Sequence, residues 1–168
     1  MARIPLGTVS DYDGPGENLA PPNLLLALGH PAELADATVE LFRILVQGDV
    51  PAKDRKLATL SIAAELRNGY EWGHHAPTAG RLGISGHELD AIRFGKRGVL
   101  DEHAQLVVDY AAAVERQDVT DGLWARAAAL FSVPQLVQLT ALSAFYGLHS
   151  RVQNALQVEQ DAGFESQF

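Results

Sequence analysis

Apolar residues in this chain recur every three or four positions, as they do along one face of an α-helix. The strict apolar–polar alternation of a half-buried strand is nearly absent, and no segment has a strand–helix–strand pattern. The sequence therefore predicts an all-α fold, a single-domain bundle of about seven or eight helices joined by short loops. The clearest predicted apolar stripe comprises Leu34, Ala37, Thr38, Leu41, Ile44 and Leu45.

Glycines, prolines and capping side chains mark the expected ends of these helices. Asn68-Gly69 suits a left-handed cap at the end of one helix. Ser85, with Glu88 three residues later, has the sequence of a capping box at the start of another. Thr120 suits the N-cap of a further helix, and Gly83 is the expected stop of the helical segment that begins at Tyr70. Together these signals predict helices over residues 24–28, 31–47, 51–68, 70–82, 85–94, 101–116, 120–130 and 132–159.

The beginning of the chain lacks this periodicity and is rich in glycine and small polar residues. Residues 1–20 are expected to form an extended N-terminal arm that lies across the surface or reaches a neighbouring subunit. Residues 21–168 are expected to form one helical domain, long enough to bury a core of its own.

Composition excludes several classes of function. The formal net charge is −8 and the 13 lysines and arginines are scattered, so nucleic acid is not an expected partner. Because the chain has no cysteine, disulfides, thiolate nucleophiles, Cys-ligated zinc and iron–sulfur clusters are excluded. No apolar run has the length of a secretory signal or a membrane span, so we expect a soluble, cytoplasmic protein.

One segment, Asn68 to Pro77, concentrates the polar and aromatic side chains that chemistry requires. If it is helical, Glu71 and His75 lie one turn apart on the same face, and Tyr70 and His74 form a second such pair beside them. A carboxylate next to an imidazole holds its tautomer and raises its basicity. The first pair is therefore a candidate for proton transfer near neutral pH.

Simpler interpretations of the same residues remain open. An exposed Glu–His pair one turn apart contributes only about a few tenths of a kcal/mol to helix stability. Trp72 has the character of a core anchor, and His74 that of a surface or subunit-interface residue. A bound metal is not expected, because Tyr70 stands where the zinc-protease helix motif has its first histidine. The other histidines show no ligand spacing with the pair: His30, His87, His103 and His149.

Tyr70-Glu71-Trp72-x-x-His75, followed by Arg81-Leu82-Gly83-Ile84-Ser85, resembles the core of carboxymuconolactone decarboxylase-like proteins, which are relatives of the alkylhydroperoxidase D group. The likeness extends over roughly residues 20–160. It implies an all-α fold and a homo-oligomer, often a trimer or hexamer, with the active cleft near a subunit boundary.

The departures from that resemblance are informative. In the peroxidase branch, two cysteines with a two-residue spacer act together with an upstream glutamate and a downstream histidine. Those positions correspond here to Asn68, Glu71, Lys56 and His75, so only the histidine is kept. Neither asparagine nor glutamate can form a thiolate, and thiol peroxidase activity is excluded. The true decarboxylases need neither cofactor nor cysteine, but they are shorter and lack the Tyr-Glu-Trp signature.

Two functions are consistent with these residues. The first is a cofactor-independent acid–base enzyme, a lyase of the decarboxylase type or an isomerase, acting on a small organic acid or lactone. His75 would be its general acid or base, and Glu71 would orient His75 or share the proton. Substrate contacts are expected from Tyr70, His74, Asn68, Lys56 and Trp72, although Lys56 also fits a solvated helix position. The second function is that of an inactive relative, a ligand-binding or structural homo-oligomer.

Overall fold

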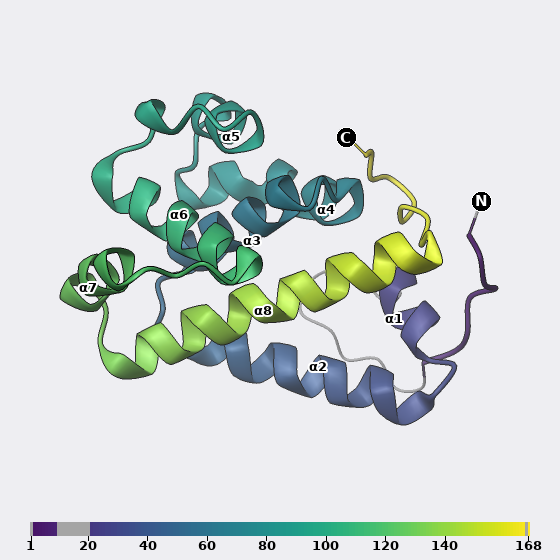
Figure 1. Cartoon of the computed structure of the whole chain (residues 1–168). Helices are drawn as coiled ribbons and strands as arrows, with labels where there is room; N and C mark the ends of the chain where they lie inside the picture. Colours follow the sequence, from purple (N-terminus) through teal and green to yellow (C-terminus); the bar gives the residue numbers. More distant parts are fainter. Residues whose placement is uncertain (1, 10–20, 167) are drawn as a thin grey trace.

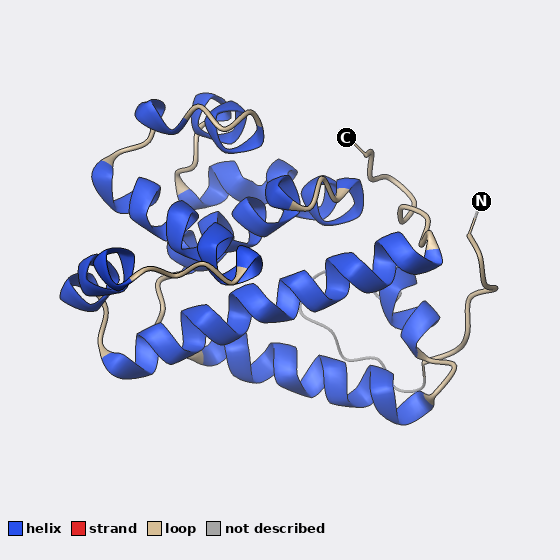
Figure 2. Ribbon diagram, viewed as in Figure 1, coloured by secondary structure: helices blue, strands red, loops and turns tan. Residues whose placement is uncertain are grey.

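The computed structural model describes residues 2–9, 21–166 and 168, and all regular structure in this part of the chain is helical (Figures 1 and 2). The predicted all-α class is confirmed. The helices are α1 (Asn23–Leu28), α2 (Ala32–Gln47), α3 (Ala52–Glu65), α4 (Gly69–Ala79), α5 (Gly86–Arg93), α6 (Glu102–Arg116), α7 (Asp121–Leu130) and α8 (Val133–Leu156), with 3-10 turns η1 (Gly80–Leu82) and η2 (Arg97–Val99).

Helix α3 lies at the centre of the fold and contacts α4, α5, α6 and α8. Its residues Leu57, Leu60 and Ile62 are fully buried, as its central position requires. The long α8 crosses the molecule, with α2 along one side of it and the α3–α6 group on the other (Figure 1). This arrangement leaves room for a site between α1, α2, α3, α4 and α8.

Several predicted helix boundaries are confirmed by the capping contacts. Ser85 and Glu88 form both hydrogen bonds of a capping box. Thr120 caps α7 by accepting the backbone N–H of Leu123. Gly83 ends the α4–η1 segment in the left-handed conformation, with φ of 73°.

The cap expected at Asn68-Gly69 was wrong. The left-handed residue after α3 is Arg67, with φ of 48°, whereas Asn68 is extended and begins α4. Its side chain accepts a hydrogen bond from the backbone N–H of Glu71 at 2.9 Å, so asparagine acts as an N-cap here. At the far end of the chain, α8 stops short of the expected Glu159 because Gln157 adopts a left-handed conformation, with φ of 52°.

The apolar stripe predicted for α2 was also wrong in part. The buried line along this helix is Ala35, Thr38 and Leu45, with Phe42 half-buried between them. The neighbouring line of larger residues is exposed, because α8 covers α2 along one narrow face only. The exposed apolar residues of α2 are Leu34, Leu41 and Ile44, at 47%, 46% and 59% exposure.

The N-terminal segment lies near the last turn of α8, whereas the C-terminal residue Phe168 lies against Trp72 of α4 (Figure 1). The backbone N–H of Arg3 donates to the carbonyl of Leu156, and that of Gly7 donates to the carbonyl of Leu26, both at 2.9 Å. The beginning of the predicted N-terminal arm therefore lies against its own chain. The remainder of that arm, residues 10–20, lies outside the described residues.

None of the helices described here is long and apolar enough to cross a lipid bilayer.

Candidate active site

A cavity of about 290 Å³ opens between α1, α2, α3, α4 and α8. Its size suits a small organic molecule, and its walls are mainly aliphatic and aromatic with a few polar groups. Five of the seven predicted site residues line it: Lys56, Tyr70, Glu71, His74 and His75. The other lining residues are Pro22, Leu24, Leu25, Thr38, Val39, Phe42, Phe145, Tyr146 and His149.

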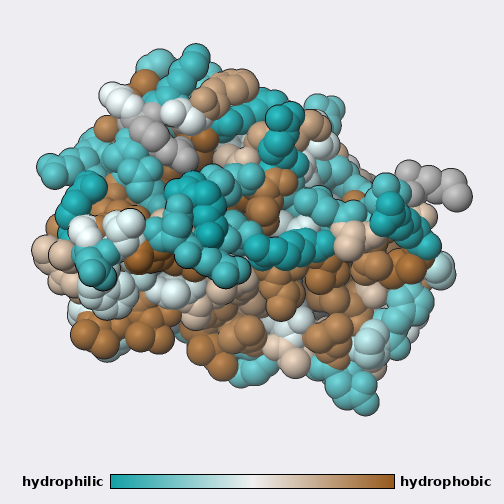
Figure 3. All heavy atoms as spheres, viewed as in Figure 1, coloured by the Kyte–Doolittle hydropathy of each residue, from teal (hydrophilic) through white to brown (hydrophobic). Residues whose placement is uncertain are grey.

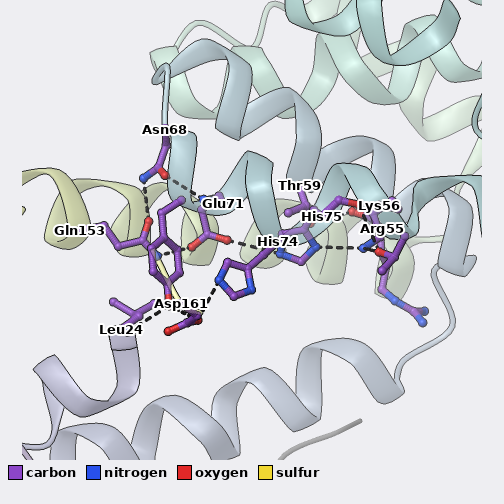
Figure 4. A network of polar contacts seen from close by, with 12 residues as sticks. Leu24, Arg55, Lys56, Thr59, Asn68, Glu71, His74, His75, Gln153 and Asp161 are labelled. Carbon is purple, nitrogen blue, oxygen red and sulfur yellow. Dashed lines mark hydrogen bonds and ion pairs between the residues drawn. The ribbon is translucent and has the colours of Figure 1, made fainter. Parts of the chain in front are cut away.

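A continuous chain of three polar side chains runs along the cavity wall (Figure 4). The Nζ atom of Lys56, on α3, lies 3.0 Å from Nδ1 of His75 on α4. The Nε2 atom of His75 lies 3.4 Å from Oε2 of Glu71, one helical turn earlier. Both ring nitrogens of His75 are therefore engaged, and all three side chains line the cavity.

Buried amides hold the carboxylate end of this chain in place. Gln153 of α8 donates a hydrogen bond to Oε1 of Glu71 at 2.5 Å, and Asn68 donates to Gln153 at 2.7 Å. Asn68 is 1% exposed and does not line the cavity, so its predicted contact with substrate is wrong. It fixes the start of α4 and, through Gln153, the position of Glu71.

The protonation states follow from burial and from these contacts. Burial alone would raise the pKa of Glu71, but hydrogen bonds from His75 and Gln153 and nearby imidazole charge hold that pKa below its usual value. Burial lowers the pKa of His75, and the neighbouring Lys56 charge adds to this effect against the pull of Glu71. Burial lowers the pKa of Lys56 to about 8, although Glu71 opposes the shift.

At neutral pH Glu71 is thus a carboxylate, His75 is a neutral imidazole, and Lys56 is an amine that is mostly protonated. One tautomer satisfies every contact, and we assign it from the hydrogen bonds. In it, His75 carries its proton on Nε2 and donates to Glu71, while Nδ1 accepts from Lys56. These contacts connect Lys56 to Glu71 through His75, and all three side chains line the cavity.

A second polar cluster joins α4 to the C-terminal segment. Asp161 accepts a hydrogen bond from the Tyr70 hydroxyl at 2.8 Å, and it lies 2.8 Å from Nε2 of His74. The His74 ring is stacked between Tyr70 and Phe164, with ring centroids 4.6 and 3.9 Å away. Burial would raise the pKa of Asp161, but its hydrogen bonds with His74, the Asn23 backbone and Tyr70 lower it. His74 and Tyr70 therefore anchor the cavity wall.

Two glycines allow the C-terminal segment to lie directly against α4. A Cβ atom on Gly69 would fall 1.8 Å from Oγ of Ser166, and one on Gly73 would fall 2.7 Å from the carbonyl oxygen of Glu165. Any larger residue at either position would push the segment away. The sequence pattern indicated a cap at Gly69 and gave no role to Gly73.

Sequence reasoning missed the contribution of α8. His149 lines the cavity and is only 5% exposed. Its Nε2 has no hydrogen-bond partner among the described residues. Burial lowers its pKa, against the attraction of Glu71. Tyr146 meets the His75 ring edge-on at 5.2 Å and hydrogen-bonds to Thr59. The spacing of Tyr146, His149 and Gln153 places them on one face of a helix, but it does not say that this face packs against α4.

Trp72 faces away from the cavity. It is 1% exposed, belongs to the main apolar core, and meets the ring of Phe168 in a T-shaped contact at 5.4 Å. The predicted contact between Trp72 and substrate is wrong, and its alternative role as a core anchor fits the structure. Across residues 2–9, 21–166 and 168, no three histidine or carboxylate side chains gather in a way that could hold a metal ion.

Comparison with known proteins agrees with the fold and with the resemblance predicted from the sequence. The chain has the all-α fold of alkylhydroperoxidase D-like proteins. Its residues 32–99 match the sequence model of the Carboxymuconolactone decarboxylase family. This matched segment includes the helices that carry Lys56, Glu71 and His75. A comparison with curated protein sequences gives no match.

Solved structures that share this fold include the following three. A peroxidase-related protein from Silicibacter sp. TM1040 has a TM-score of 0.75 and 17% identity, with 85% of this chain and 78% of the other covered. A peroxidase-related alkylhydroperoxidase AhpD core protein from Ralstonia eutropha JMP134 has a TM-score of 0.73 and 18% identity, with 84% and 77% covered. The debrominase Bmp8, as a cysteine-to-alanine variant with 2,3,4-tribromopyrrole, has a TM-score of 0.71 and 19% identity, with 84% and 78% covered.

Proposed function

We propose that the protein is a cofactor-independent acid–base enzyme, a lyase of the decarboxylase type or an isomerase, acting in the cytoplasm on a small organic acid or lactone. The observation that carries this proposal is the Lys56–His75–Glu71 chain along the wall of a small, largely apolar cavity. In such a cavity, charge that develops on a substrate interacts strongly with fixed polar groups, because little water screens it.

Of the three hydrogen-bonded side chains, Lys56 is the one that acts on a substrate. An ammonium group has three N–H donors, and His75 and Thr78 accept two of them, at 3.0 and 3.1 Å. The third is available to a carboxylate or a lactone carbonyl in the cavity. As an enolate develops, Lys56 donates a proton to its oxygen or carbon and becomes a neutral amine that His75 and Glu71 hold in place. Lys56 regains a proton from water when the product leaves. The unpartnered Nε2 of His149 offers a second polar contact for the substrate.

The alternative is a catalytically inactive relative that binds a small ligand or serves as a structural homo-oligomer. It is favoured by the loss of three of the four residues that the peroxidase branch uses. Its difficulty is the set of buried amides that orient Glu71, because a site without chemistry gains nothing from a fixed tautomer at His75.

A substrate screen separates the two functions. Lactone acids and oxo acids are tested for turnover with the wild type, with His75→Ala, and with His87→Ala as a control at an exposed histidine. We expect His75→Ala to lower kcat/KM by about 10²–10⁴-fold and His87→Ala to leave it unchanged. If no acid is turned over, but one raises the melting temperature in proportion to its binding, the inactive alternative is correct.

We also propose that the protein assembles into a homo-oligomer through the exposed apolar residues of α2. Hydrophobic side chains gather along the lower part of the molecule in Figure 3, where Figure 1 places α2. The exposed apolar residues of α2 include Leu41 and Ile44, and α8 adds Val133 and Val137 at 72% and 63% exposure. Exposed apolar patches of this kind commonly mark contacts between proteins.

Introducing a charge into this surface should dissociate the oligomer. Ile44→Asp places an unpaired carboxylate in the proposed contact, and we expect monomers at micromolar concentrations where the wild type is associated. Light scattering after size-exclusion chromatography measures the mass. Asp36→Lys, at an exposed polar position of the same helix, is the control and should remain associated. A monomeric wild type would contradict the proposal.

A further inference from the structure

We propose that Lys56 is a nucleophile that forms an imine with the carbonyl group of a small oxo acid. The inference rests on the proposed function for its cavity and its proton chain. It goes beyond that function by naming a covalent step and a substrate class, an organic acid that also carries an aldehyde or ketone group.

The arrangement has the three parts that activate a nucleophile. The attacking atom, Nζ of Lys56, lies within hydrogen-bonding distance of a base, Nδ1 of His75, at 3.0 Å. The base is oriented by a third group, the carboxylate of Glu71, at its other nitrogen. Serine and cysteine nucleophiles are activated by the same order of groups, with the amine here in place of the hydroxyl or thiol.

The surroundings of Lys56 favour its neutral, reactive form. An amine attacks a carbonyl carbon only when it is unprotonated, and an ordinary lysine is almost wholly protonated at neutral pH. The apolar walls of the cavity lower the pKa of Lys56 to about 8, so about one molecule in ten has the free amine at neutral pH. The chain has three lysines in all, and neither Lys53 nor Lys96 lines the cavity.

The step balances without any co-reactant. The neutral amine of Lys56 adds to the carbonyl carbon, and an N–H proton passes to Nδ1 of His75, whose imidazolium is stabilised by Glu71. The carbinolamine takes this proton on its oxygen and loses water, which leaves the imine. Protonation of the imine nitrogen makes it an electron sink.

With a 3-oxo acid the same intermediate allows decarboxylation. The bond between the carboxylate carbon and its neighbour breaks, carbon dioxide leaves, and the electron pair moves into the iminium to form an enamine. Protonation of the enamine carbon and hydrolysis by water then release the ketone and regenerate the amine. The unpartnered Nε2 of the largely buried His149 offers a contact to the acid group of the substrate.

Reductive trapping tests the inference. The full chain is incubated with pyruvate, acetoacetate or glyoxylate and sodium borohydride, which converts an imine into a stable secondary amine. Intact-mass and peptide mass spectrometry then locate the adduct. We expect at least about tenfold more adduct on Lys56 than on Lys53 or Lys96, since the less basic amine is neutral more often. The rate of trapping should rise with pH and level off above about 8.

Two variants make the result specific. The double variant Lys53→Arg/Lys96→Arg leaves Lys56 as the single lysine and should retain the adduct. Lys56→Arg keeps the positive charge but cannot form an imine, and it should lose both the adduct and the turnover of the oxo acid, with circular dichroism as the check on folding. Absence of an adduct on Lys56 with all three probes overturns the inference.

The outcome is distinguishable from failure of the proposed function. Turnover that depends on Glu71 and His75 but persists in Lys56→Arg overturns the imine and the role of Lys56 as proton donor, and leaves acid–base catalysis by His75 and Glu71 standing. An adduct on Lys56 in a protein that turns over no acid supports the nucleophile and contradicts the proposed catalysis.

Discussion

Replacing Glu71 by glutamine is expected to lower kcat/KM by about 10³–10⁴-fold while the protein stays folded. The glutamine carbonyl can still accept the hydrogen bond from Gln153. Its amide, however, cannot accept the proton on Nε2 of His75. The His75 proton therefore moves to Nδ1, where it faces the N–H groups of Lys56 and interrupts the proton chain.

The measurement is steady-state kinetics on the acid found by the screen, with unfolding by urea as the check on stability. Glu65→Gln is the matched control, because Glu65 pairs with Arg116 at the surface of α3 and lies outside the cavity. We expect its kinetics to equal those of the wild type. Kinetics within threefold of the wild type for Glu71→Gln would show that the tautomer of His75 has no part in the reaction.

Replacing Trp72 by alanine is expected to lower the free energy of unfolding by about 3–5 kcal/mol. The indole is 1% exposed and packs in the main core, so its removal leaves a cavity in addition to the lost burial. For a protein of ordinary stability this is a large share of the total. Urea unfolding followed by circular dichroism at several temperatures measures the change.

The other tryptophan of the chain provides the control. Trp124 on α7 is 47% exposed, and Trp124→Ala should change the free energy of unfolding by no more than about 1 kcal/mol. If Trp72→Ala kept full stability but raised KM, the indole would belong to the substrate site and not to the core.

Much of the fold could be predicted because it depends on local signals. Helix periodicity, the Ser85–Glu88 capping box and the Thr120 cap all act over a few residues, and each was confirmed. The errors in helix boundaries arose where one residue type suits two different kinds of helix cap. Asparagine suits both a left-handed cap and an N-cap, and the contact with Glu71 decides for the second at Asn68.

The α2 stripe shows a different limit. Leu41 and Ile44 continue the apolar pattern of the buried line, but α8 covers only the adjacent face of the helix. Periodicity identifies which residues share a face and cannot say which of two apolar faces a neighbouring helix covers. The larger residues are left for a contact outside the chain, which is the basis of the proposed oligomer.

The site could be predicted only as far as one helix carries it. The four-residue spacing of Glu71 and His75 sets their contact locally. Lys56 was predicted as a site residue because the family resemblance places it where the peroxidase branch has a glutamate. Gln153 and Asp161 could not be inferred, because they reach the site from more than 80 positions along the chain. Only packing of α8 and the C-terminal segment against α4 brings them there.

Observation of the His75 ring nitrogens by heteronuclear NMR tests the central claim most directly. The chain has six histidines, and His75→Gln assigns the signals. The structure predicts a neutral ring at neutral pH, with the proton on Nε2 and an unprotonated Nδ1 that accepts from Lys56, and a shift of that proton to Nδ1 in Glu71→Gln. An imidazolium at neutral pH, or a proton on Nδ1 in the wild type, would contradict the Lys56–His75–Glu71 chain.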